Sequence, residues 1–215
     1  MYPMLSTHLD LAYAVGALGR HAANPREEHE RALDWVFQYL QATKDWCLTY
    51  QHGALAGVIL TGFVDTDWAN ELSNHSSTSR YIYQLAGGAI SWSSKKQSLI
   101  ALLSTEAKYI MGAHATKEAI WLRQLLAELG LPDDDPTILQ MDSQSAIAIA
   151  KNPQFHNRTK YIEVCHHFLC RQVEEEKIEL DYIPTNDQVA DTLTKGLNQE
   201  KHTKFTKEMG LGHLV

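Results

Sequence analysis

Four acidic residues, far apart in the chain, occupy positions at which a mixed α/β fold brings side chains together. Asp65 and Asp142 each follow a short apolar run that predicts a β-strand. Glu106 lies in the first turn of a long predicted helix, and Asp191 lies inside the last predicted helix. Because sites in open α/β sheets form beyond the carboxyl ends of the strands, the four carboxylates are candidates for one shared pocket.

Carboxylates gathered in one pocket point to a bound cation. Their charges repel one another, and burying them is costly unless a cation neutralises them. Hard oxygen ligands favour Mg²⁺ or Mn²⁺. Two such ions about 3.5–4 Å apart can activate a water molecule and stabilise the leaving oxygen of a phosphodiester. The four acids therefore indicate metal-dependent hydrolysis of a phosphodiester as a candidate chemistry.

Each acid also has an ordinary structural explanation. Glu106 can complement the helix dipole at an N-terminal turn, and Asp142 can cap the short helix that follows it. Asp65 can be a turn residue at a strand end, with Asp67 as a rival on the same side of the strand. Asp191 can be an exposed helix acid. Spacing alone leaves these explanations open.

The elements around the acids follow a mixed α/β order. Residues 185–188 fit a capping box that opens the last helix, and Gly87-Gly88 marks the turn between the second and third strands. The predicted strands are 58–64, 79–85, 89–93, 137–141 and 178–183, and the helices between them are 104–129, 143–151 and 159–175. This order predicts an α/β fold with a five-stranded mixed sheet flanked by helices.

The first part of the chain has a different pattern. Residues 8–20 and 27–42 show helical spacing of apolar side chains, and 46–50 predicts a strand. The pattern changes at Ala56. We therefore predict a helical appendage over residues 1–55 and an α/β domain over residues 56–211.

Composition limits the possible functions. Apolar residues make up 44% of the 215 residues, which suits a folded core. No apolar run approaches the ~20 residues of a membrane helix, and the start of the chain lacks the pattern of a secretory signal. Three cysteines, Cys47, Cys165 and Cys170, are too few for a disulfide framework and predict reduced thiols in an intracellular protein.

The net charge of −7 argues against a protein that depends on non-specific nucleic-acid binding, since phosphate contacts need Lys and Arg. One stretch is locally basic, however. Its basic residues and histidines are Lys151, Arg158, Lys160, Arg171, His156, His166 and His167. This stretch predicts either a nucleic-acid footprint or a solvated helix face, and the sequence favours neither.

Other chemistries have weaker support. Cys165 and Cys170 are five residues apart and share a helix face poorly, which argues against a zinc site with the nearby histidines. No Gly-x-Ser-x-Gly nucleophile motif and no Gly-rich phosphate loop occur in the sequence.

Several local strings resemble the ribonuclease H domain of copia-type retrotransposon polyproteins, and their order and spacing agree over about Val58 to Leu211. The strings are Asp65-Thr66-Asp67-Trp68-Ala69, Ser76-Ser77-Thr78-Ser79-Arg80-Tyr81, Ile90-Ser91-Trp92-Ser93-Ser94-Lys95-Lys96-Gln97, Ser104-Thr105-Glu106-Ala107, Met141-Asp142-Ser143-Gln144-Ser145-Ala146, Asn157-Arg158-Thr159-Lys160, His166-His167-Phe168 and Ala190-Asp191-Thr192-Leu193-Thr194-Lys195.

The resemblance implies a ribonuclease H-like fold and an endonuclease that cuts the RNA strand of RNA–DNA hybrids during reverse transcription. It implies that Asp65, Glu106, Asp142 and Asp191 are catalytic and hold two Mg²⁺ ions, for which Mn²⁺ can substitute. The residues expected to contact the nucleic acid are Arg158, Lys160, His167, Arg171, Lys95 and Lys96.

The first ~55 residues are similar to the tail of the preceding reverse transcriptase region, through Asp10-Leu11-Ala12-Tyr13-Ala14-Val15 and Asn24-Pro25. The polymerase motif of a Tyr followed by paired Asp does not occur, so the chain is expected to be a polyprotein fragment that does not polymerise DNA. The implied partners are the hybrid and the rest of the polyprotein, reverse transcriptase and integrase. The implied location is the cytoplasm, in virus-like particles, and the nucleus.

The sequence departs from the family pattern at three places. Lys108 stands where another acid is common, Cys165 stands where a basic residue is common, and no His lies between Pro184 and Asp187. The absent His, the acidic net charge and the missing polymerase motif keep a second hypothesis open, a catalytically inactive relic that binds nucleic acid without cutting. A third hypothesis, strand transfer as in integrases, fits poorly, because those sites resemble a three-acid pattern with a different final acid.

Overall fold

The computed structural model of the chain describes residues 2–51, 59–67, 78–96, 104–132, 134–151 and 160–213. The backbone alone is described at 66–67, 78–79, 95–96, 104–109, 149, 160–164 and 166. None of the helices in these ranges is both long enough and apolar enough to span a membrane.

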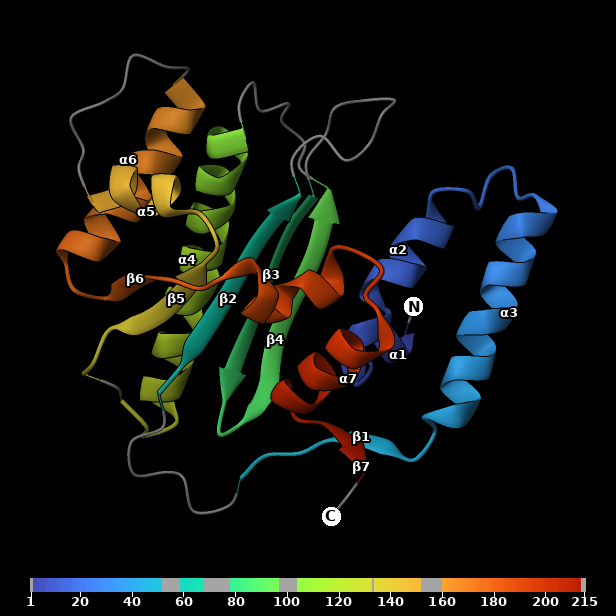
Figure 1. Ribbon diagram of the computed structural model, residues 1–215. Helices are drawn as coiled ribbons and strands as arrows, with labels where there is room; N and C mark the ends of the chain where they lie inside the picture. The colour runs from blue at the N-terminus through green and yellow to red at the C-terminus, as the bar shows by residue number, and fades with distance from the viewer. Residues whose placement is uncertain are drawn as a thin grey trace.

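A five-stranded mixed sheet forms the centre of the molecule, in the order β4-β3-β2-β5-β6 (Figure 1). Strands β2, β3 and β4 pair antiparallel, whereas β5 pairs parallel with both β2 and β6. The bounds are β2 Thr61–Asp67, β3 Thr78–Leu85, β4 Gly88–Lys96, β5 Thr137–Met141 and β6 Ile178–Tyr182. The expected fold class, an α/β fold with a five-stranded mixed sheet, is confirmed.

Three helices cover one face of this sheet. They are α4 (Ser104–Glu128), α5 (Gln144–Lys151) and α6 (Lys160–Glu174). Their apolar side chains pack on inward-facing strand residues such as Val64, Tyr83 and Leu139. Tyr83 is fully buried and donates its hydroxyl to the Ala115 carbonyl at 2.6 Å, which fixes α4 on the sheet. Burial raises the pKa of Tyr83 well above its ordinary value.

The opposite face is covered by the N-terminal and C-terminal segments (Figure 1). Phe63 of β2 and Ile82 of β3 pack there against Leu9, Val189 and other buried residues of a second core cluster. The elements of this layer are α1 Tyr2–Ser6, η1 Leu9–Leu11, α2 Ala12–Gly19, α3 Glu27–Ala42, η2 Thr185–Asp187, η3 Val189–Leu193 and α7 Gln199–Glu208. Because strand side chains alternate between faces, Val64 and its neighbour Asp65 point to different layers.

A small second sheet joins the two ends of the chain. Strand β1 (Trp46–Leu48) pairs antiparallel with β7 (Leu211–His213), so that Trp46 lies opposite His213. The Thr49 amide donates to the Gly210 carbonyl at 2.8 Å. The predicted helical segment is therefore packed against the α/β domain. The predicted boundary at residue 55 falls outside the described residues and stays a prediction.

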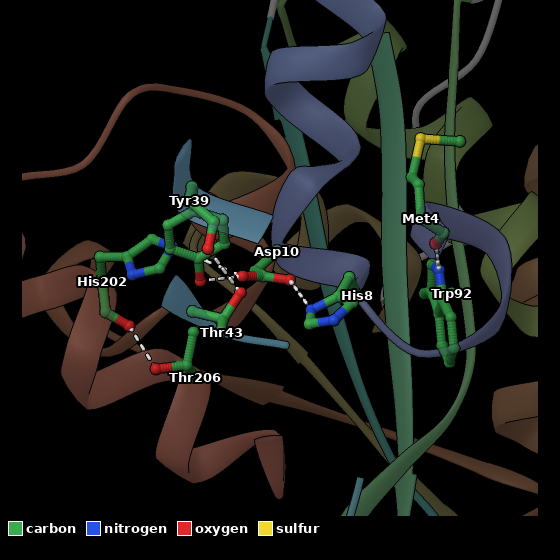
Figure 2. A network of polar contacts seen from close by, with 8 residues as sticks. All are labelled: Met4, His8, Asp10, Tyr39, Thr43, Trp92, His202 and Thr206. Carbon is green, nitrogen blue, oxygen red and sulfur yellow. Dashed lines mark hydrogen bonds and ion pairs between the residues drawn. The ribbon is translucent and has the colours of Figure 1, made fainter. Parts of the chain in front are cut away.

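A buried carboxylate connects three elements of the N-terminal and C-terminal layer (Figure 2). The side chain of Asp10, in η1, is fully buried and accepts a hydrogen bond from the Tyr39 hydroxyl of α3. His8 Nδ1 lies 3.7 Å from Asp10 Oδ1, and His202 Nε2 of α7 lies 3.9 Å from Asp10 Oδ2. Burial first, and then the Asp10 charge, raise the pKa of Tyr39 above its ordinary value.

Most predicted elements agree with the structure, and helix 27–42 and strand 137–141 agree at both ends. Two details of the predicted strands and turns are wrong. Strand β2 continues through Asp65 to Asp67, because β3 pairs with it over that length. The turn consists of Ala86 and Gly87, with φ of 52° and 78°, and Gly88 already belongs to β4. Both turn residues are left-handed, as a two-residue hairpin turn requires.

The capping box predicted at residues 185–188 is also wrong. Thr185 begins a short 3₁₀ helix without a side-chain cap at its start. A second 3₁₀ helix, η3, follows it, and Gln188 caps this one by accepting from the Ala190 amide. The last helix before the chain end is α7, which begins after Asn198. Asp191 therefore lies in a 3₁₀ helix.

We predict that Tyr39→Phe lowers the free energy of unfolding by about 1–3 kcal/mol, because the buried Asp10 carboxylate loses a hydroxyl donor. Urea unfolding followed by circular dichroism measures the change. Tyr2→Phe is the matched control, since Tyr2 is 80% exposed. Equal stability of the two variants would show that the contact contributes nothing.

Candidate active site

The register of the parallel strands brings Asp65 and Asp142 to one end of the sheet. Strands β2 and β5 pair from Thr61 opposite Ile138 to Val64 opposite Met141. Asp65 and Asp142 are the next residues on the two strands. Neighbouring strands lie about 4.8 Å apart. The backbones of Asp65 and Asp142 therefore lie side by side just after the last pair, Val64 and Met141.

A buried glutamine brings Asp191 to the same place. Gln188 is fully buried, and its Nε2 donates to the carbonyl oxygen of Val64 at 3.0 Å. Its Oε1 accepts from the Ala190 amide at 3.3 Å. The glutamine therefore holds the start of η3 against the residue that precedes Asp65. The side chain of Asp65 belongs to the sheet face that η3 covers, because it shares the parity of Phe63.

Two of the ordinary explanations for the acids do not hold. Asp191 is 1% exposed and is not a surface helix acid. Asp65 is 6% exposed and lies inside β2 instead of in a turn. For Asp142 the capping explanation stays open, although the neighbouring Ser143 caps α5: its Oγ accepts from the Ala146 amide at 3.3 Å. Asp142 itself is partly buried.

The fourth acid is placed by its backbone alone. Glu106 is the third residue of α4, as predicted, so the helix-dipole explanation remains open for it. The side chains of Glu106 and of Asp67 lie outside the described part of the structure. The structure thus brings the backbones of Asp65, Asp142 and Asp191 together, and the joining of Glu106 to them stays a prediction.

Two basic side chains lie beside the buried acids. Lys195 Nζ is 2.6 Å from Asp191 Oδ2, one helical turn along the chain. Arg80 of β3 lies directly opposite Asp65 in the strand register and is 5% exposed. Directly opposite residues project from one face with their Cβ atoms about 4.5–5.5 Å apart. Arg80 Nε also donates to Ser94 Oγ at 3.1 Å.

The donor types at this end of the sheet fit a hard divalent cation. Asp65, Asp142 and Asp191 offer only carboxylate oxygens, which Mg²⁺ and Mn²⁺ prefer. The Lys195 ammonium against Asp191 shows that a positive charge is favourable in this position. Among the side chains that the structure describes, however, no three His, Cys, Asp or Glu residues are grouped closely enough to hold an ion. The acids are near one another but not arranged as a closed ligand set.

The expected nucleic-acid contacts are only partly described. Arg158 lies outside the described residues, and Lys95, Lys96 and Lys160 are placed by backbone alone. His167 and Arg171 are exposed on α6. These contacts stay predictions.

The charge of Arg171 is shared with a neighbouring acid. Its Nε lies 2.7 Å from Glu175 Oε1, and Lys177 Nζ lies 2.7 Å from Glu175 Oε2. Hydrogen bonds from Lys177 and Arg171 lower the pKa of Glu175, so the acid stays charged. A phosphate would therefore compete with Glu175 for Arg171.

Sequence reasoning missed the roles of three residues. Gln188 was part of the predicted capping box, and a buried glutamine beside a strand end has no sequence signal. Lys195 follows Asp191 by four residues, the spacing of a helical ion pair, and this signal was present. The position of Arg80 opposite Asp65 could be predicted only from the β2–β3 register, which sequence periodicity does not determine.

The chain is similar to curated transposon proteins over nearly its whole length. It is 41% identical to the Retrovirus-related Pol polyprotein from transposon TNT 1-94 of Nicotiana tabacum over 211 residues, which is 98% of this chain and 16% of that protein. It is 36% identical to the corresponding polyprotein from transposon RE2 of Arabidopsis thaliana over 205 residues, which is 95% of this chain and 14% of that protein. The chain belongs to the retrovirus-related Pol polyproteins of transposons. No family model matches it.

This Pol chain spans only about a seventh of the length of the two plant polyproteins, and it corresponds to one segment of them. Another relative is shorter. The Secreted RxLR effector protein 161 of Plasmopara viticola is 43% identical over 122 residues, which is 57% of the Pol chain and 84% of that protein.

Solved structures similar to the Pol chain include ribonuclease H domains. The N-terminal RNase H domain of a Mycobacterium tuberculosis protein has a TM-score of 0.47 and 10% identity, and covers 70% of this chain and 98% of its own. The foamy viral protease-reverse transcriptase has a TM-score of 0.48 and 14% identity, and covers 82% of this chain and 22% of its own.

We predict that Gln188→Met lowers the free energy of unfolding by about 1–3 kcal/mol, because the Val64 carbonyl and the Ala190 amide lose their buried partner while the volume is nearly kept. Urea unfolding measures the change. Gln199→Met, at an exposed position in α7, is the control. A stability of Gln188→Met equal to that of the control would contradict the role of Gln188 in holding η3.

Proposed function

We propose that this Pol segment is a ribonuclease H-type endonuclease that hydrolyses the RNA strand of RNA–DNA hybrids during reverse transcription of a retrotransposon. The observation that carries the proposal is the convergence of Asp65, Asp142 and Asp191 at one end of the sheet. Membership of the Pol family and the motif resemblance to copia-type ribonuclease H domains support it.

In this proposal the four acids hold two divalent ions. Asp65 and Asp191 supply buried carboxylates, which keep their orientation because packing surrounds them. Asp142 lies on the more open side and faces the substrate. Glu106 adds a ligand from the first turn of α4. When bound, such ions activate the attacking water and neutralise the charge that develops on the phosphodiester.

The chain's own residues supply orientation and a low dielectric. Gln188 holds Asp191 near Asp65, and Ser143, the residue after Asp142, caps α5. Because Asp65 and Asp191 are buried, the local dielectric constant is lower than in water, and their attraction to a cation is therefore stronger than it would be in bulk water. No histidine lies between Pro184 and Asp187 to act as a general base from this loop, and the bound ions would supply the activation of water.

The hybrid is proposed as the substrate on the basis of the family. Pol polyproteins carry further regions beyond the matched segment, and we propose the reverse transcriptase and integrase regions as partners. The same reasoning proposes an intracellular site of action, in cytoplasmic virus-like particles and in the nucleus. Arg158, Lys160, His167, Arg171, Lys95 and Lys96 are proposed to contact the hybrid.

We predict that the purified chain releases fragments from a labelled RNA strand paired with DNA when Mg²⁺ is present. Asp142→Asn should reduce the rate more than about 100-fold, since it removes transition-state charge stabilisation worth several kcal/mol. Asp134→Asn, in an exposed loop, is the matched control and should cut normally. Cutting by Asp142→Asn at the control rate would overturn the proposed site.

One observation favours a second function, binding of the hybrid without cutting. Asp191 already has an ammonium at ion-pair distance, and the described acids are not arranged as a closed ligand set. The same assay separates the two functions. Salt-sensitive hybrid binding without fragments, in the unsubstituted chain with Mg²⁺ or Mn²⁺, would support the inactive form.

We predict that Arg158→Gln weakens hybrid binding by a similar factor for all sequences and lowers the slope of log affinity against log salt by about one. Fluorescence anisotropy at several salt concentrations measures this slope. Lys44→Gln, at an exposed position just before β1, is the charge-matched control. An unchanged slope in Arg158→Gln would remove this residue from the proposed interface.

A further inference from the structure

The ion pair between Lys195 and Asp191 joins a buried carboxylate to a lysine that is partly exposed. Asp191 is 1% exposed, whereas Lys195 is 42% exposed, and their charged atoms are 2.6 Å apart. By contrast, both partners are well exposed in pairs such as Arg31–Glu27 and Lys204–Asp187. An exposed pair exchanges easily with water, but a buried carboxylate needs a cation.

Lys195 occupies one side of the acid that is proposed to bind the metal. A carboxylate oxygen at 2.6 Å from an ammonium cannot accept a divalent ion in the same direction, because the two cations repel each other. From this geometry we infer that Lys195 is a tethered counter-ion, which holds Asp191 in the metal-free chain and competes with Mg²⁺ for it. The inference rests on the proposed function, since it concerns the same site.

The surroundings of Lys195 allow it to leave. It lines a cavity of about 520 Å³ that extends between α2 and α3 and is also bordered by Thr192, Asp10 and His202. A displaced ammonium can therefore remain hydrated, and no buried side chain has to be repacked. Arg80, beside Asp65, is 5% exposed and lacks this freedom. Lys195 is thus the movable cation of the site and Arg80 the fixed one.

The competition between Lys195 and Mg²⁺ for Asp191 should lower the apparent Mg²⁺ affinity by an amount that can be measured. If the ion pair is closed in about nine-tenths of the molecules, the apparent Mg²⁺ affinity is about tenfold weaker than the intrinsic affinity. Removing the ammonium removes that factor. Lys195 is a positioning residue in this account, because it acts on the metal through Asp191.

The test is a calorimetric titration of Mg²⁺ into the full chain at constant pH and ionic strength, with three variants. Lys195→Met removes the charge and should bind Mg²⁺ about tenfold more tightly. Lys195→Arg keeps the charge and should bind as the unsubstituted chain does. Lys201→Met removes one positive charge from α7, where its Nζ contacts Asn186 Oδ1 at 2.8 Å, and controls for a general charge effect.

A thermal measurement gives a second readout that does not depend on cutting. Without metal, Lys195→Met should lower Tm by about 2–4 °C or more, because the buried Asp191 loses an ammonium at ion-pair distance. Adding Mg²⁺ should raise Tm more in Lys195→Met than in the unsubstituted chain. The double variant Lys195→Met/Asp191→Asn should lose this difference.

The outcomes separate the inference from the proposed function. Suppose that the unsubstituted chain binds Mg²⁺. If the Mg²⁺ affinity of Lys195→Met is then no higher than that of the unsubstituted chain, or no higher than that of Lys201→Met, the competition is overturned while the metal site stands. If no variant binds Mg²⁺, both are overturned. If Mg²⁺ binds only after Lys195 is replaced, the counter-ion is strong enough to keep the unsubstituted site closed, and the inference is supported.

Discussion

The buried amide of Gln188 is the contact on which the arrangement of the acids depends. It joins the Val64 carbonyl on a central strand to the Ala190 amide at the start of η3. Asp65 follows the first of these residues and Asp191 follows the second, so one side chain sets the separation of two acids that are 126 positions apart in the sequence. Both bonds are shielded from water, which makes them sensitive to a loss of either partner.

The acids show a balance between burial and charge. Two carboxylates are almost completely removed from water, and each has a basic residue as a neighbour: Arg80 lies across the strand pair from Asp65, and Lys195 follows Asp191 by four residues. Without these cations the cluster would repel itself. The same cations make the site less attractive to a metal ion. The metal-free fold is thus stabilised by the groups that a divalent ion would have to displace or accept as neighbours.

The sequence predicted the sheet and its covering helices well, because apolar periodicity and turn residues are local signals. Helix 27–42 and strand 137–141 agree at both ends. It predicted Asp65 and Asp142 directly after apolar strand residues, which agrees with the β2–β5 register, and the convergence of all four acids stays a prediction. It did not predict the two 3₁₀ helices after Pro184, because their conformation depends on the contact of Gln188 with β2. Arg80 was missed because a cross-strand neighbour depends on register, whereas the four-residue spacing of Asp191 and Lys195 was visible in the sequence.

The pairing of β1 with β7 bears on where this segment can be divided. Trp46, Cys47 and Leu48 are hydrogen-bonded neighbours of the last described residues, and the apolar side chains of Met209 and Leu211 are buried in the same layer. A chain that began at residue 56, where the sequence pattern changes, would leave β7 as an unpaired edge strand with apolar residues facing water. Such edges promote association between molecules. Cleavage of the chain at that point would therefore separate β7 from its partner strand β1.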